Sequence, residues 1–139
     1  MFDTYGTERL TKWKEFRSEL ETASDPLKEV ASFWSRAPFV NSYINPLVPS
    51  QWPDPWHLVL DNRYDDLAIC LGMLYTIKLT QRFMDTDFEI HMTTQDDKNK
   101  NYFLVVDKTH VLNFEYGSVC DLSMVNVKSN ILYSGTKLP

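Results

Sequence analysis

Apolar positions near the start of the chain recur at helical spacing. After Thr7, large apolar residues return every three or four positions with charged residues between them, at Leu10, Trp13, Phe16 and Leu20. This spacing predicts an amphipathic helix with one buried face. A second helix is predicted from Asp25-Pro26, because aspartate caps helices and proline is tolerated at the first helical position. Residues 1–37 are therefore expected to form a helical region.

The longest apolar run of the sequence, Leu67–Tyr75, directly follows Asp65-Asp66. The acidic pair favours the positive end of a helix, and the run is apolar on nearly every helical face. The pattern predicts a central helix that is surrounded by other elements. A shorter helix is predicted before it, from Asp54-Pro55 until Asn62-Arg63.

After residue 85 the hydrophobic period changes to two. Three apolar residues alternate with three polar ones in the stretch Phe88, Glu89, Ile90, His91, Met92 and Thr93. Such alternation predicts a strand with one buried face. Further strands are expected at 102–106 and 111–114, with weaker signals at 119–127 and 131–133 and a hairpin loop at 95–101.

Helices followed by strands predict an α+β fold, with N-terminal helices and a buried central helix packed on a C-terminal antiparallel meander. One domain, 1–139, is expected, since a chain of this length buries one core. Within it we expect a helical region at residues 1–37, an extended arm at residues 38–53, and the central helix with the sheet at residues 54–139.

The arm is rich in both proline and aromatic residues. It contains four prolines, which resist a regular helix or a central strand, and it is too apolar for a free linker. Its rings either pack over the buried helix or anchor a protein partner. The partner-binding residues predicted on the second interpretation are Phe39, Tyr43, Trp52 and Trp56.

Composition and charge narrow the function classes. A formal net charge of −5 argues against binding to DNA or RNA, and no stretch approaches the 18 apolar residues of a transmembrane helix. The first residues lack the features of a secretory signal peptide. The two cysteines form no CxxC pair, and the three histidines lack metal-ligand spacing. We expect no metal, cofactor or small-molecule substrate.

The start of the central helix carries a resemblance. The stretch 62–71, Asn-Arg-Tyr-Asp-Asp-Leu-Ala-Ile-Cys-Leu, resembles the active-site helix of transglutaminase-like, papain-like cysteine enzymes. The strands at 101–106 and 110–113 resemble the family's next two strands, which bear a histidine and then an aspartate. The positions that would correspond hold Tyr64 for the nucleophile, Asn101 or Tyr102 for the histidine, and Asn113 for the aspartate. The resemblance therefore implies a catalytically dead form of the fold.

An active cysteine hydrolase remains an alternative, with Cys70 as nucleophile and His91 as base. Cys70 lies almost two turns inside the predicted central helix, however, where a buried cysteine that behaves as a small apolar residue is the more common case.

The run at 46–56, Pro-Leu-Val-Pro-Ser-Gln-Trp-Pro-Asp-Pro-Trp, resembles small proteins of tailed bacteriophages, especially cyanophages. That resemblance implies a virion component or a host-directed factor, located in the virion or the host cytoplasm. The leading hypothesis is a non-enzymatic structural or assembly protein that binds copies of itself or other virion proteins. A phage accessory protein that binds a host protein is the alternative.

Overall fold

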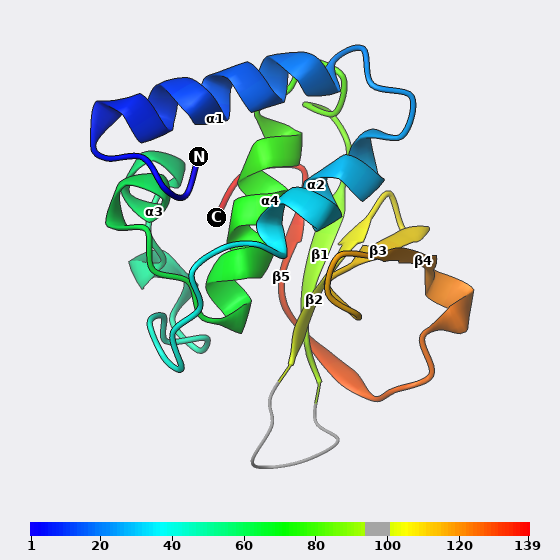
Figure 1. The fold of residues 1–139 in the computed structure, drawn as a ribbon. Coiled ribbons are helices and arrows are strands. Elements are labelled where there is room, and N and C mark those ends of the chain that lie inside the picture. The colour runs from blue at the N-terminus through cyan, green and yellow to red at the C-terminus, as the bar shows by residue number, and fades with distance from the viewer. Residues whose placement is uncertain (94–100) are drawn as a thin grey trace.

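The computed structural model describes residues 1–93 and 101–139 (Figure 1). The helices are α1 (Thr7–Leu20), α2 (Pro26–Trp34), α3 (Pro55–Asp61) and α4 (Asp66–Lys78). The strands are β1 (Phe88–Thr93), β2 (Tyr102–Val106), β3 (His110–Leu112), β4 (Val119–Asp121) and β5 (Ser129–Gly135). Helices precede strands, so the predicted α+β class is confirmed.

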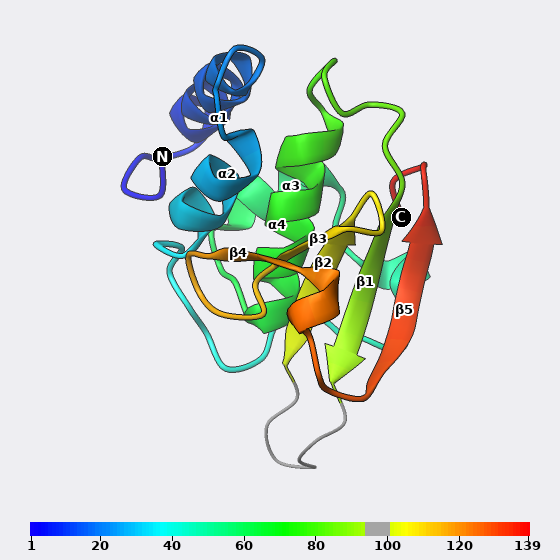
Figure 2. The same cartoon turned by 90° about the vertical axis from the view of Figure 1, so that its right-hand side faces the viewer.

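The described strands form an antiparallel sheet with the order β4-β3-β2-β1-β5. Strands β1 to β4 follow one another as a meander, but β5 crosses back and pairs with β1 at the opposite edge (Figure 2). The expected simple meander is therefore wrong for the last strand. The strand expected at 119–127 ends at Asp121, whose carboxylate accepts a hydrogen bond from the Ser123 N–H and begins a short 3-10 turn. Of the hairpin loop predicted at 95–101, all but residue 101 lies outside the described residues.

Helix α4 is the centre of the core. Every residue from Leu67 to Lys78 is buried, because α1, α2 and α3 lie on one side of the helix and the sheet lies on the other (Figure 2). The sheet contributes one apolar face to this core, made by Phe88, Ile90, Met92, Leu104, Val106 and Leu112. The buried central helix predicted from the apolar run is confirmed.

The opposite face of the sheet has a smaller core of its own. Phe103, Val105 and Val111 are buried there, under apolar side chains from the segment that runs from β4 to β5. The strands thus separate two apolar layers, and alternate residues along β1 and β2 belong to different layers. Side chains on opposite faces of the sheet therefore cannot contact each other.

Candidate functional site

The two aspartates at the start of α4 point to different partners. The Asp65 side chain caps the helix by accepting from the Ala68 N–H at 2.8 Å, and its other oxygen accepts from the backbone N–H groups of Tyr43 (2.8 Å) and Ile44 (2.9 Å). Asp65 therefore fixes the arm to the helix. This bears out the helix-start role that the sequence predicted, and its side chain is fully used by it.

Asp66 instead faces the sheet. Its carboxylate accepts hydrogen bonds from the Tyr102 N–H (2.7 Å), the Asn113 side-chain amide (3.1 Å) and the Tyr116 hydroxyl (3.1 Å). Burial raises the pKa of Asp66 above its ordinary value, and the three hydrogen bonds oppose that rise. No ion pair involves Asp66 within residues 1–93 and 101–139.

Asn113 connects Asp66 to the core. Its amide nitrogen lies 2.9 Å from the Tyr102 carbonyl oxygen and 3.2 Å from the Cys70 sulfur, in addition to the contact with Asp66. The residue has a left-handed backbone (φ 68°), a conformation that asparagine tolerates better than most residues. Its side-chain oxygen is buried and has no hydrogen-bond partner among the described residues.

Two cavities are lined by residues of the loop that joins β3 to β4. A polar cavity of about 290 Å³ is lined by Asp66, Asn101, Asn113, Phe114, Glu115 and Tyr116. An apolar cavity of about 220 Å³ is lined by Ser35, Ala37, Phe39, Ile69 and Tyr116. Because Tyr116 lines both, we call the two cavities together the Tyr116 site.

The four predicted partner-binding residues do not share one surface. Trp52 is only 8% exposed, and its indole N–H donates to the Asn45 carbonyl at 3.0 Å, so its ring belongs to the core. Tyr43 is half-buried, its hydroxyl donates to Asp61, and the Arg63 guanidinium lies 4.9 Å from its ring centre. Both side chains therefore pack within the protein, as the first interpretation of the arm expects.

Phe39 and Trp56 remain exposed, at 54% and 46%, but in different places. Trp56 lies on α3, with its ring edge-on to Trp13 at 5.7 Å between centroids. Phe39 lies beside Tyr64, with which it forms a single bridge, and lines the apolar cavity of the Tyr116 site. A partner-binding role stays a prediction for Phe39 and Trp56.

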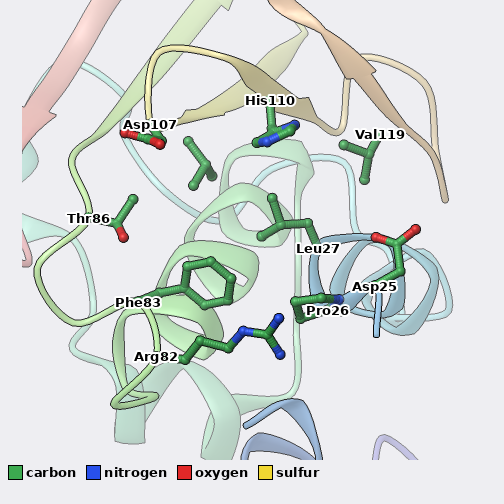
Figure 3. Close-up of a pocket in the computed structure, with 10 residues that line it drawn as sticks. Asp25, Pro26, Leu27, Arg82, Phe83, Thr86, Asp107, His110 and Val119 are labelled. Atoms are coloured by element: carbon green, nitrogen blue, oxygen red, sulfur yellow. The ribbon is translucent and has the colours of Figure 1, made fainter. Parts of the chain in front are cut away.

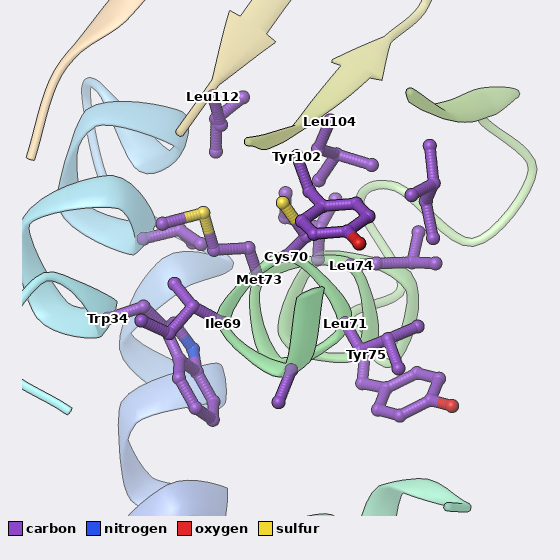
Figure 4. Close-up of a cluster of buried hydrophobic side chains, with 14 of the residues drawn as sticks. Trp34, Ile69, Cys70, Leu71, Met73, Leu74, Tyr75, Tyr102, Leu104 and Leu112 are labelled. Carbon is purple, nitrogen blue, oxygen red and sulfur yellow. The ribbon is translucent and has the colours of Figure 1, made fainter. Parts of the chain in front are cut away.

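The structure does not bring Cys70 and His91 together. Cys70 is fully buried among apolar side chains of α4 and the sheet, and burial raises the pKa of its thiol well above the ordinary value (Figure 4). His91 lies on the other face of the sheet, stacked on Phe103 at 4.8 Å and hydrogen-bonded to Ser129 (2.8 Å). The sheet separates the two side chains, so the alternative of a hydrolase that uses this pair is wrong.

The positions singled out by the resemblance to transglutaminase-like enzymes meet only partially. Tyr102 and Asn113 both contact Asp66 at the start of α4. Tyr64 does not, because its ring is fully buried and packs edge-on against Trp34 at 5.2 Å. The helix start at which the two strands meet is thus occupied by a carboxylate, Asp66.

A further cavity of about 290 Å³ lies between the start of α2, the α4–β1 loop and the β2–β3 turn (Figure 3). Leu27 and Phe83 supply apolar surface, and charged or titratable groups of both signs line it as well: Asp25, Arg82, Asp107 and His110. The Arg82 guanidinium donates to the Leu20 (3.1 Å) and Ala23 (2.7 Å) carbonyls, so it mainly fastens this loop to the end of α1.

Sequence reasoning missed Asp66, Asn113 and Tyr116 as a group. One signal was available in the sequence. Tyr116 is a large aromatic residue in a short segment between two strands, where neither a helical nor a strand repeat of apolar positions accounts for it. The separate role of Asp66 was overlooked because a helix start accounts for an acidic pair in the sequence. In the structure, only Asp65 caps the helix.

Within the described residues, no group of three or more histidine, cysteine, aspartate or glutamate side chains is arranged to hold a metal ion. None of the helices in that portion of the chain has both the length and the apolar character needed to cross a bilayer. Comparison of the chain with protein-family models, with curated proteins and with solved structures found no match.

Proposed function

We propose that this protein acts by binding partner proteins through the Tyr116 site and does not catalyse a reaction. One observation carries the proposal: Phe39 and Tyr116, 54% and 63% exposed, are aromatic side chains from distant segments that line one apolar cavity. Exposed aromatic residues beside a cavity are typical of the anchor positions of protein interfaces.

The chemistry around the site supports a binding role. Asp66 is held by three hydrogen-bond donors, and the nearest thiol, Cys70, is buried with a raised pKa. A buried thiol of this kind is a poor nucleophile, because the thiolate is the reactive form. The proposal therefore keeps the non-enzymatic character expected from the sequence.

The class of partner follows from the resemblance of the 46–56 run to tailed-phage proteins. On that basis the partners are copies of this chain or other virion proteins, and the protein is a structural or assembly component. A host protein is the second candidate, and the same surface serves either role.

The test compares exposed residues inside and outside the site. Phe39→Ser and Tyr116→Ser remove the two rings, and Trp56→Ser removes an exposed ring on α3 as the matched control. Thermal melts first check that all three variants fold. Sedimentation of the purified protein detects self-association, and affinity purification with mass spectrometry detects other partners.

We expect a complex that Phe39→Ser and Tyr116→Ser abolish and that Trp56→Ser retains. A complex lost only with Trp56→Ser would move the interface to α3. A complex that all three variants retain would contradict the proposal.

A further inference from the structure

We infer that the partner segment bound at the Tyr116 site carries a lysine or arginine next to an apolar residue, an inference that rests on the proposed function. The basic side chain enters the polar cavity beside Asp66 and Glu115. The apolar side chain enters the cavity beside Phe39.

The charge of the site selects a cation. Asp66 and Glu115 both line the polar cavity, and among the described residues no lysine or arginine lines either cavity. Asp66 is half-buried and forms no ion pair with any described residue. Since removing a carboxylate from water is unfavourable without a counter-charge, a cation from a partner stabilises the ionised form.

The hydrogen-bonding groups of the cavity point to the same ligand. Asn113 is 4% exposed and lines the polar cavity, and its side-chain oxygen accepts no hydrogen bond among the described residues. The Asp66 and Glu115 carboxylates add further acceptors among the residues that line the same cavity. Lysine and arginine are the side chains that only donate, with three and five N–H groups.

The spacing of the two cavities fits neighbouring residues of one segment. Asp66 lines the polar cavity and Ile69 lines the apolar one, and the two are three residues apart on the same side of α4. Three residues rise about 4.5 Å along a helix, and an extended peptide rises about 3.3 Å per residue, so nearby residues of one bound segment can reach both cavities.

The experiment selects binders from a random heptapeptide library displayed against the purified full chain. Selected peptides are then made with the basic residue replaced by norleucine, and binding is measured by calorimetry. Glu115→Gln tests the site, and Glu19→Gln is the matched control, because both residues are exposed and both changes remove one negative charge.

We expect selected peptides to pair lysine or arginine with an apolar neighbour, and norleucine to weaken binding by about tenfold or more, as for other charged hydrogen bonds. Glu115→Gln weakens binding and Glu19→Gln does not. Peptides without a basic residue that still lose binding on Tyr116→Ser would overturn this inference and leave the proposed function standing. If no selected peptide depends on Tyr116, or none is selected, the proposed function fails as well.

Discussion

The indole N–H of Trp34 donates a hydrogen bond to the hydroxyl of Thr76 at 2.9 Å, in the centre of the apolar core. Trp13 donates to the same oxygen at 2.9 Å, and the hydroxyl itself donates to the Gly72 carbonyl at 2.6 Å. One threonine on α4 thus satisfies the polar atoms of two buried tryptophans, one from α1 and one from α2.

Thr76→Val is predicted to lower the free energy of unfolding by about 2–6 kcal/mol. The substitution keeps the shape of the side chain but leaves two buried indole N–H groups without an acceptor, at about 1–3 kcal/mol each. Thr76→Ser is the matched control, since it keeps the hydroxyl and is expected to cost about 1 kcal/mol for the lost methyl group. Urea denaturation measures both, and equal losses for the two variants would contradict the role of the hydroxyl.

Gly72→Ala is predicted to destabilise the protein by about 1–3 kcal/mol through overpacking. A Cβ atom at position 72 would come within 2.4 Å of the Trp34 ring, so α2 and α4 must move apart. This outcome opposes the helix propensity of alanine, which alone would stabilise the helix by about 1 kcal/mol.

A double-mutant cycle with Trp34→Leu separates these effects. The smaller leucine removes the contact, so Gly72→Ala should cost less in that background than in the wild type. An unchanged cost in the Trp34→Leu background would show that the contact between the ring and position 72 is not the cause.

The parts of the fold that could be predicted are those in which a local pattern of apolar residues is compatible with only one kind of element. The run Leu67–Tyr75 has no polar face, so the helix that contains it has to be buried, and it is. The alternation from Phe88 likewise reports a strand with two different faces. The position of β5 was not predictable in this way, because its pairing with β1 depends on a long connection that crosses the sheet, and no local pattern encodes that path.

The candidate site was only partly predictable, because its residues act through tertiary contacts. Proline and aromatic content in residues 38–53 indicated a special segment, yet it could not distinguish Trp52, which enters the core, from Phe39, which stays exposed. Asp66 and Tyr116 are fifty positions apart, and their contact depends on the start of α4 meeting the β3–β4 loop.

The two cysteines are predicted to differ in reactivity. Cys70 is fully buried with a strongly raised thiol pKa, whereas Cys120 lies at the edge strand β4 and is partly exposed. The thiol reagent DTNB, which releases a yellow product on disulfide exchange, should therefore modify one thiol in the folded protein and two in denaturant. Cys120→Ser should leave no thiol that reacts in the folded protein. Rapid reaction of Cys70 in the native state would contradict its burial.

Tyr116→Phe is predicted to raise the pKa of Asp66 further. Burial already holds that pKa above its ordinary value, and the Tyr116 hydroxyl lowers it by donating to the carboxylate, so removing the hydroxyl removes a stabiliser of the ionised form. Carbon-13 NMR titration of the Asp66 carboxyl measures the change, with Tyr5→Phe, an exposed tyrosine 85% accessible, as the control. A pKa that falls in Tyr116→Phe would contradict the hydrogen bond.

The raised pKa of Asp66 also makes the stability of the protein depend on pH. Because the pKa of Asp66 is higher in the folded than in the unfolded chain, its contribution to stability is complete below the unfolded value, near 3.9, and is lost as the pH rises through the raised folded value. A bound cation opposes this loss. Under the inferred mode of binding, a lysine-containing peptide should lower the Asp66 pKa in the same NMR titration, and its norleucine counterpart should not.

Trp52→Ala and Trp56→Ala are predicted to have different effects, although only four positions separate the two residues. Trp52 is 8% exposed and its ring lies 6.2 Å from that of Tyr133 in β5, so its removal leaves a cavity and should cost about 3–5 kcal/mol. Trp56 is 46% exposed and loses mainly its edge contact with Trp13, which is worth about 1 kcal/mol. Urea denaturation of the two variants gives the comparison.

If Trp52→Ala were as stable as the wild type, Trp52 would be free to act as an anchor and the arm would again be the first candidate for the interface. A large loss for Trp52→Ala alone means instead that any partner contact of the four predicted residues depends on the exposed rings, Phe39 in the arm and Trp56 on α3.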